Sequence, residues 1–118
     1  MVDKSEPIIG IDLGTTYSCA AIMRNGSVEV IPELQNTGIK TLPSIVCFRD
    51  KSDCLIGTHA RNNMLEYPKS TMFDSKRLLG HKFKNEYVQN DIKNWPIKVI
   101  EDKKTGKPQY VINVEKEV

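Results

Sequence analysis

The run Ile8–Leu13 is apolar except for one carboxylate, Asp12, and it leads directly into a Gly-Thr-Thr turn. Removing an ionised carboxylate from water costs several kcal/mol unless another group compensates its charge. The acid therefore leaves two interpretations open. Either Asp12 belongs to an ordinary hairpin with an Asx-type turn, or it faces a site that holds a cation or a phosphate.

The N-terminal part of the chain predicts an antiparallel meander. Residues 7–13 and 17–23 carry apolar side chains on both faces, which is typical of strands in the centre of a sheet. Asn25-Gly26 is a strong hairpin signal because both positions can adopt positive φ, and residues 27–31 follow as a third strand. Two turns therefore organise this region, one after the first strand and one at the Asn-Gly pair.

The rest of the chain alternates short strands with two short helices. Further strands are expected at residues 44–48, 54–56, 97–101 and 109–114. Apolar residues at helical spacing predict a helix that starts at Thr58 and stops at Pro68. A second helix is expected between a cap at Asn85 and a stop at Pro96. The fold class is α/β, with a mixed sheet and a few short helices.

Composition excludes several classes of function. The 118 residues suit one globular domain, with 39% hydrophobic and 27% charged residues. A net charge of +2 gives no electrostatic reason to expect a nucleic-acid or membrane partner. No apolar run approaches the ~18 residues of a membrane span, and the polar N-terminus does not resemble a secretory signal. Three cysteines without Cys-x-x-Cys spacing predict reduced thiols in a cytoplasmic protein, and the two histidines lack zinc-ligand spacing.

The turn after the first strand has the residue types of a phosphate site. Gly14 is expected to adopt positive φ, so that Thr15, Thr16 and Tyr17 point successive N–H groups into one concavity. The threonine hydroxyls add donors, and Asp12 could hold an accompanying hard cation through water. Neither of the two common glycine-rich phosphate-loop patterns is present, so on these residues alone an ordinary hairpin remains open.

A second stretch, Phe73–Gly80, places two cations where a helix disfavours them. Asp74 is expected to cap a short helix that Gly80 closes, which puts Lys76 and Arg77 in the first turn. The helix dipole opposes positive charge there by a few tenths to ~1 kcal/mol. The two side chains either point at an anion or simply project into water.

The two stretches, with their order and spacing, resemble one family. Residues 9–19 resemble the first phosphate-binding motif of the 70-kDa heat-shock chaperones, the heat shock protein 70 family. The stretches 55–57, 73–80 and 93–96 resemble the same family, and the similarity runs from about Pro7 onward. Actin and the sugar kinases share the Asp-x-Gly-Thr/Ser hairpin but not the Lys-Arg-Leu-Leu-Gly stretch or the Trp-Pro that follows.

The resemblance implies a role for each residue of the turn. Asp12 would face the Mg²⁺ and the monovalent cation, K⁺, mostly through water. Gly14, Thr15, Thr16 and Tyr17 would hold the β- and γ-phosphates of ATP or ADP through backbone amides and hydroxyls.

It also implies roles for the basic pair. Lys76 would be the catalytic residue that reaches the γ-phosphate and stabilises its charge as the phosphoryl group leaves. Arg77 would bind nucleotide on the adenine side. Together with the turn, these residues would form one half of a nucleotide site.

The resemblance further implies an actin-like ATPase, or ribonuclease H-like, fold that is incomplete here. Residues 1–118 would be the N-terminal part of the nucleotide-binding domain, with base-subdomain hairpins in 1–43 and the outer subdomain of lobe I in 44–118. In the intact protein, ATP hydrolysis would be coupled to protein folding in the stress response.

The resemblance implies four kinds of partner: nucleotide, unfolded client polypeptides, J-domain co-chaperones and nucleotide exchange factors. The second phosphate motif and the remaining active-site carboxylates of the family are absent from these 118 residues, so the chain alone is expected to be inactive as an ATPase. Its exposed strand edges are expected to favour self-association. The alternative is a truncated, non-hydrolysing relative that acts as an interaction module.

Overall fold

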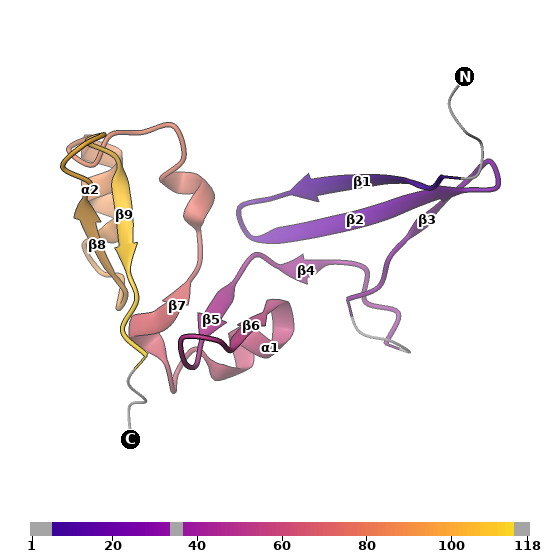
Figure 1. Cartoon of the computed structure of the whole chain (residues 1–118), viewed down its shortest axis with the longest axis horizontal. Coiled ribbons are helices and arrows are strands. Elements are labelled where there is room, and N and C mark those ends of the chain that lie inside the picture. Colours follow the sequence, from indigo (N-terminus) through magenta and orange to yellow (C-terminus); the bar gives the residue numbers. More distant parts are fainter. Residues whose placement is uncertain (1–5, 34–36, 115–118) are drawn as a thin grey trace.

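The computed structural model describes residues 6–33 and 37–114, which form three small sheets in chain order (Figure 1). The first sheet contains β1 (Ile8–Leu13), β2 (Tyr17–Arg24), β3 (Ser27–Val30) and β4 (Leu42–Pro43). The second contains β5 (Val46–Phe48), β6 (Cys54–Ile56) and β7 (Thr71–Met72), and the third contains β8 (Lys98–Glu101) and β9 (Pro108–Val111). The helical segments are α1 (Gly57–Asn63), η1 (Pro68–Ser70), η2 (Ser75–Arg77) and α2 (Glu86–Ile92). Most elements match the sequence prediction, but both helices and several strands are shorter.

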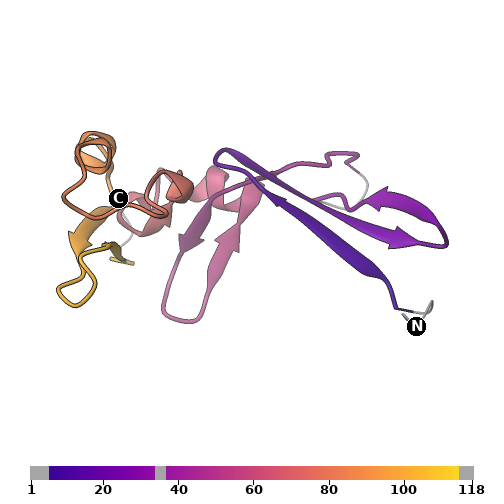
Figure 2. The same cartoon turned by 90° about the horizontal axis from the view of Figure 1, so that it is seen from above.

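Strand β2 is the centre of the first sheet. It pairs antiparallel with β1 along its length, from Ile8↔Met23 to Leu13↔Ser18. Its other edge pairs with β3 near one end and with β4 near the other. The predicted Asn25-Gly26 turn is confirmed, with φ of 50° and 77°, and Figure 2 shows the meander as a long extended ribbon.

Strand β1 occupies the edge of this sheet rather than its centre. Within the described part of the chain it pairs only with β2, and all six of its residues are exposed. Ile11, for example, keeps 72% of its surface accessible. The predicted central position is therefore confirmed for β2 and wrong for β1. Apolar side chains on both faces indicate that a strand needs to be covered by other elements. No strand among the described residues pairs with the free edge of β1.

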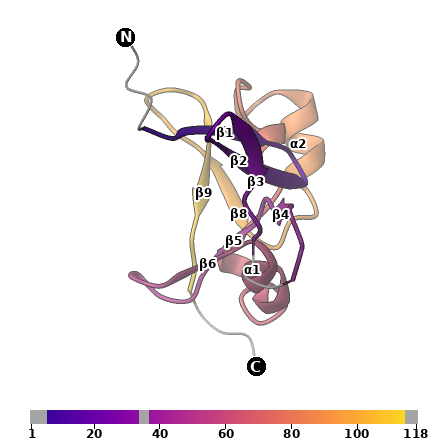
Figure 3. The ribbon, with the colours of Figure 1, turned by 90° about the vertical axis from the view of Figure 1, so that its right-hand side faces the viewer.

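Two polar caps organise the helices. The Asn85 side chain accepts a hydrogen bond from Tyr87 N at 2.9 Å, so the predicted cap of α2 is confirmed. Helix α1 has no cap from its own N-cap residue. Instead, the carboxylate of Glu33 accepts from Thr58 N at 2.5 Å and from Thr58 Oγ1 at 2.7 Å. This contact ties the loop after β3 to the second sheet, whose position beside α1 is visible in Figure 3.

The buried core is small and lies in and around the second and third sheets. Its fully or nearly fully buried apolar side chains are Cys47, Ala60, Leu78, Val88 and Ile97. Phe73 and Trp95 pack with ring centroids 5.1 Å apart, so Trp95 serves packing. The Cα radius of gyration is 17.4 Å, whereas a compact domain of this length measures about 13.5 Å. The extended first sheet accounts for this difference (Figure 1).

Tyr110 should make this region sensitive to alkaline pH. Burial, assisted by the negative charge of Asp74, raises the pKa of Tyr110 to about 12 from the usual 10.0. Because the folded state holds this proton more tightly than the unfolded state, the contribution to stability is complete below pH 10 and is lost as the pH rises from 10 to about 12. Urea unfolding of the wild type and of Tyr110→Phe between pH 10 and about 12 checks this contribution. The free energy of unfolding should fall more in the wild type than in Tyr110→Phe. Parallel losses in the two proteins would contradict the assignment.

Candidate functional site

The turn between β1 and β2 requires glycine at position 14 because the backbone folds back tightly on itself. A β-carbon on Gly14 would overlap the carbonyl oxygen of Tyr17, far inside contact distance. The predicted reason for this glycine, a positive φ, is wrong, since Gly14 does not adopt one. The residue is needed for close approach of two backbone segments, and the neighbouring backbone oxygen cannot move aside as a flexible side chain could.

The same turn presents backbone donors. The amide nitrogens of Thr15 and Thr16 have no hydrogen-bond partner within the described ranges. Thr16 and Tyr17 are exposed and Thr15 is half-buried, so these groups are accessible from outside. Unpaired amides on successive residues, with two hydroxyls beside them, are the chemical features that phosphate oxygens require.

Lys76 is the residue that connects the two stretches predicted from sequence. It lies in η2, yet its Nζ donates to the carbonyl oxygen of Leu13 at 2.6 Å, across 63 residues of sequence. In Figure 1 the turn between β1 and β2 points toward the segment that follows β7, which carries η2. An ammonium group therefore lies against the last residue of β1, immediately before the turn that presents free amides. This arrangement is suited to an anion.

Arg77 is placed differently. Its Nε lies 3.3 Å from an oxygen of Asp74, and both side chains are partly exposed. Asp74 adopts a left-handed conformation with φ 51° and makes no side-chain cap, so the predicted capping role is wrong. Its carboxylate instead accepts a hydrogen bond from Nε of Arg77, three residues later. Such exposed pairs contribute little stability, and this one leaves the guanidinium accessible.

Asp12 lies in β1 on the strand face opposite Ile11 and Leu13, because side chains alternate along a strand. Its carboxylate is exposed, and its neighbour across the ladder is Cys19. The described residues contain no group of three or more His, Cys, Asp or Glu side chains placed to hold a metal. A single exposed carboxylate suits Mg²⁺, which keeps several waters and usually binds one or two carboxylates together with substrate phosphates.

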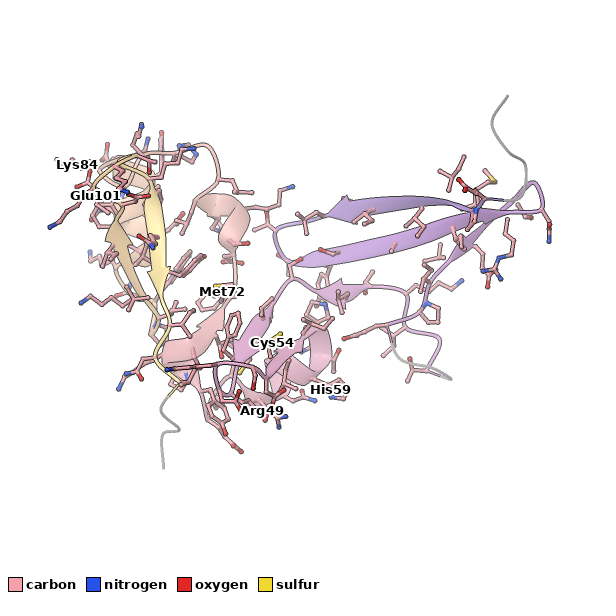
Figure 4. The ribbon with its side chains drawn as sticks, viewed as in Figure 1. Arg49, Cys54, His59, Met72, Lys84 and Glu101 are labelled. Atoms are coloured by element: carbon pink, nitrogen blue, oxygen red, sulfur yellow. The ribbon has the colours of Figure 1, made fainter. Side chains whose placement is uncertain are left out.

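Several other titratable side chains lie away from the turn. Figure 4 shows Cys54 and His59 near β6 and α1, and Lys84 and Glu101 at the distant third sheet. The three cysteines are free thiols, as the sequence predicted. The groups suited to a phosphate, which are the unpaired amides and Lys76, lie at the β1–β2 turn and in η2.

A hollow of about 470 Å³ lies on the face of the first sheet that carries Ile11 and Leu13. It is lined mainly by apolar side chains, among them Ile11, Leu13, Ile45 and Ile56, with few polar groups. Asp12 projects from the opposite face of β1, whereas Ser18 and Ser44, which also line the hollow, contact each other on this side of the turn.

Sequence reasoning missed Ser44, which hydrogen-bonds to the turn, and Ser18, which contacts Ser44. Ser44 Oγ donates to the carbonyl oxygen of Gly14 at 2.7 Å, and Ser44 N donates to that of Thr16 at 2.9 Å. Ser18 Oγ lies 2.8 Å from Ser44 Oγ. These contacts join segments 26 to 30 residues apart, and no local pattern signals them.

No helix in the described part of the chain is long and apolar enough to cross a membrane. The family model described as "Hsp70 protein" matches residues 8–117. The chain is 50% identical over 92% of its length to "Heat shock 70 kDa protein 2" of Paracoccidioides lutzii and 47% identical over the same share to "Heat shock cognate 70 kDa protein 3" of Dictyostelium discoideum. It covers only 16% and 17% of those relatives.

A shorter relative, "Heat shock 70 kDa protein cognate 1" of Drosophila simulans, is 45% identical over 87% of the chain, which covers 46% of it. The family match and the combination of small antiparallel sheets with short helices confirm the predicted α/β class, an incomplete actin-like or ribonuclease H-like fold. The chain belongs to the Hsp70 family.

Proposed function

We propose that this chain supplies the first phosphate-binding turn and the phosphate-directed lysine of the ATP-binding domain of a chaperone. The Hsp70 family is a family of nucleotide-binding chaperones. The observation that carries the proposal is the contact of Lys76 Nζ with the carbonyl of Leu13, which joins the only two stretches that sequence reasoning had linked to an anion. An ordinary hairpin would not need this long-range cation.

The turn would hold the β- and γ-phosphates. The unpaired amides of Thr15 and Thr16 support this role, as do the threonine hydroxyls and the exposed position of Tyr17. Gly14 allows the tight backbone approach that shapes the turn. Asp12 would hold the hydrated Mg²⁺, and K⁺ would bind in the same region. The magnesium ion would neutralise charge on the phosphates.

Lys76 would stabilise the γ-phosphate as charge redistributes during its transfer. Arg77 would bind on the adenine side; its guanidinium is accessible and held only by an exposed pair. We assign residues 1–43 to the base subdomain, since every strand that the structure describes up to Pro43 belongs to the first sheet, and 44–118 to the outer subdomain. In the whole protein we propose a cytoplasmic chaperone that acts on unfolded polypeptides with J-domain co-chaperones and nucleotide exchange factors.

Titration of the ¹⁵N-labelled chain with Mg·ATP tests the proposal. We expect the amide signals of Thr15, Thr16 and Tyr17 to shift, with a Kd on the order of 1 mM because half a site supplies few contacts. Magnesium tripolyphosphate should shift the same signals, and adenosine should not. No turnover of ATP is expected, since half a cleft cannot position the attacking water. Unchanged signals for all three residues at about 10 mM Mg·ATP would overturn the proposal.

A further inference from the structure

Ser44 fixes two carbonyl groups of the phosphate-directed turn. It follows β4 directly, and from this position its Oγ donates to Gly14 O at 2.7 Å and its N–H donates to Thr16 O at 2.9 Å. Because the single hydroxyl proton of Ser44 goes to Gly14, the 2.8 Å contact with Ser18 must use the Ser18 proton. Ser18 is only 8% exposed, so this short chain of hydroxyls is shielded on one side.

Fixing a carbonyl also fixes the amide that shares its peptide plane. In a trans peptide the C=O and the following N–H point in opposite directions, and the described chain contains no cis peptide bond. The bond from Ser44 Oγ to Gly14 O therefore turns the Thr15 N–H away from Ser44. The bond from Ser44 N to Thr16 O does the same for the N–H of Tyr17. The Thr15 amide is one of the two unpaired donors described above, and the Tyr17 amide is a donor that the resemblance assigns to the phosphates.

We propose that Ser44 is a positioning residue for the nucleotide phosphates. Its two hydrogen bonds aim the amides of Thr15 and Tyr17 at the ligand without touching the ligand themselves. This inference rests on the proposed function of the turn. It differs from a purely structural role, in which Ser44 would only join β4 to β2, because it assigns a separate effect to each bond. The hydroxyl governs Thr15, whereas the backbone N–H governs Tyr17.

Three variants separate positioning from stability. Ser44→Ala removes the hydroxyl and keeps the backbone bond to Thr16. Ser44→Thr restores a hydroxyl at the same position. Ser70→Ala is the matched control, since Ser70 is fully buried and its Oγ donates to the backbone carbonyl of Phe48 at 2.6 Å, in the second sheet. It removes the same type of bond away from the turn.

The first measurement uses the ligand-free chain and ¹⁵N relaxation. The Thr15 amide should have an order parameter of ~0.85 in the wild type and fall toward ~0.6 in Ser44→Ala, because its peptide plane is no longer held. The amide of Tyr17 should change less, and Ser44→Thr should restore Thr15. Ser70→Ala should leave both amides unchanged. An unchanged Thr15 order parameter in Ser44→Ala, or an equal loss in Ser70→Ala, would overturn the proposal.

The second measurement is the Mg·ATP titration of the same proteins. Loss of one orienting hydrogen bond should raise the Kd of Ser44→Ala about three- to tenfold, while Ser44→Thr and Ser70→Ala stay within about twofold of the wild type. Equal affinity in Ser44→Ala and the wild type would overturn the positioning role. If the wild type itself gives no shift at Thr15–Tyr17, the proposed function fails, and the relaxation of Thr15 still decides whether Ser44 orients the turn.

Discussion

Gly14→Ala should abolish detectable binding of Mg·ATP to this chain. The new methyl group would overlap the carbonyl oxygen of Tyr17, which belongs to the backbone and cannot rotate aside. The turn must therefore open, and the amides of Thr15 and Tyr17 lose the orientation that Ser44 gives them. Relieving the overlap should also cost about 1–3 kcal/mol of stability, as overpacking does elsewhere. Amide-resolved titration and urea unfolding measure the two effects.

Gly10→Ala is the matched control for this change. Gly10 lies in the same strand, β1, and a β-carbon there meets nothing within 4 Å. This variant should bind Mg·ATP as the wild type does and unfold at a similar urea concentration. If Gly14→Ala and Gly10→Ala bind equally well, the turn is not the phosphate site.

Lys76→Ala should reduce ATP hydrolysis at least about 100-fold in a full-length Hsp70-family protein that carries this segment, while nucleotide affinity changes less than about fivefold. The ammonium group lies beside the turn in the ligand-free chain, bound to Leu13 O. At the γ-phosphate it would meet charge that is redistributed only as the phosphoryl group leaves. Its contribution therefore belongs to the rate more than to binding.

Single-turnover rates and nucleotide affinities, measured in parallel, check the assignment of Lys76. Lys82→Ala is the matched control. The Nζ of Lys82 also donates to a backbone carbonyl, that of Thr105 between β8 and β9, at 2.6 Å. This variant should leave both quantities unchanged. An unchanged rate with a large loss of ADP affinity in Lys76→Ala would contradict a catalytic role.

Local signals in the sequence predicted much of the fold. Asn25-Gly26 specified the second turn of the meander because its backbone conformation depends on those two residues alone. Asn85 specified the start of α2 for the same reason, since its cap bond spans only two residues. The position of Lys76 beside the turn came from the resemblance to a family, because no local pattern connects residues that far apart.

Long-range contacts are what the sequence could not show. The hydroxyl of Ser44 and the carboxylate of Glu33 act on segments 25 to 30 residues away, and short polar side chains in loops give no periodic signal. The apolar pattern of residues 8–13 predicts a central strand because it indicates only that the strand needs burial, whereas β1 lies at the edge with all its residues exposed. The requirement for Gly14 was recognised, but its cause, a close backbone approach, depends on tertiary geometry.

A crystal structure of the chain with Mg²⁺ and a non-hydrolysable ATP analogue tests the central claim most directly. We predict that phosphate oxygens accept from the amides of Thr15 and Tyr17, and that Lys76 Nζ lies 2.7–2.9 Å, about the usual charge-assisted distance, from a terminal phosphate oxygen. Phosphates bound elsewhere, with Lys76 still held only by Leu13 O, would contradict the claim that this turn and this lysine form the phosphate end of a nucleotide site.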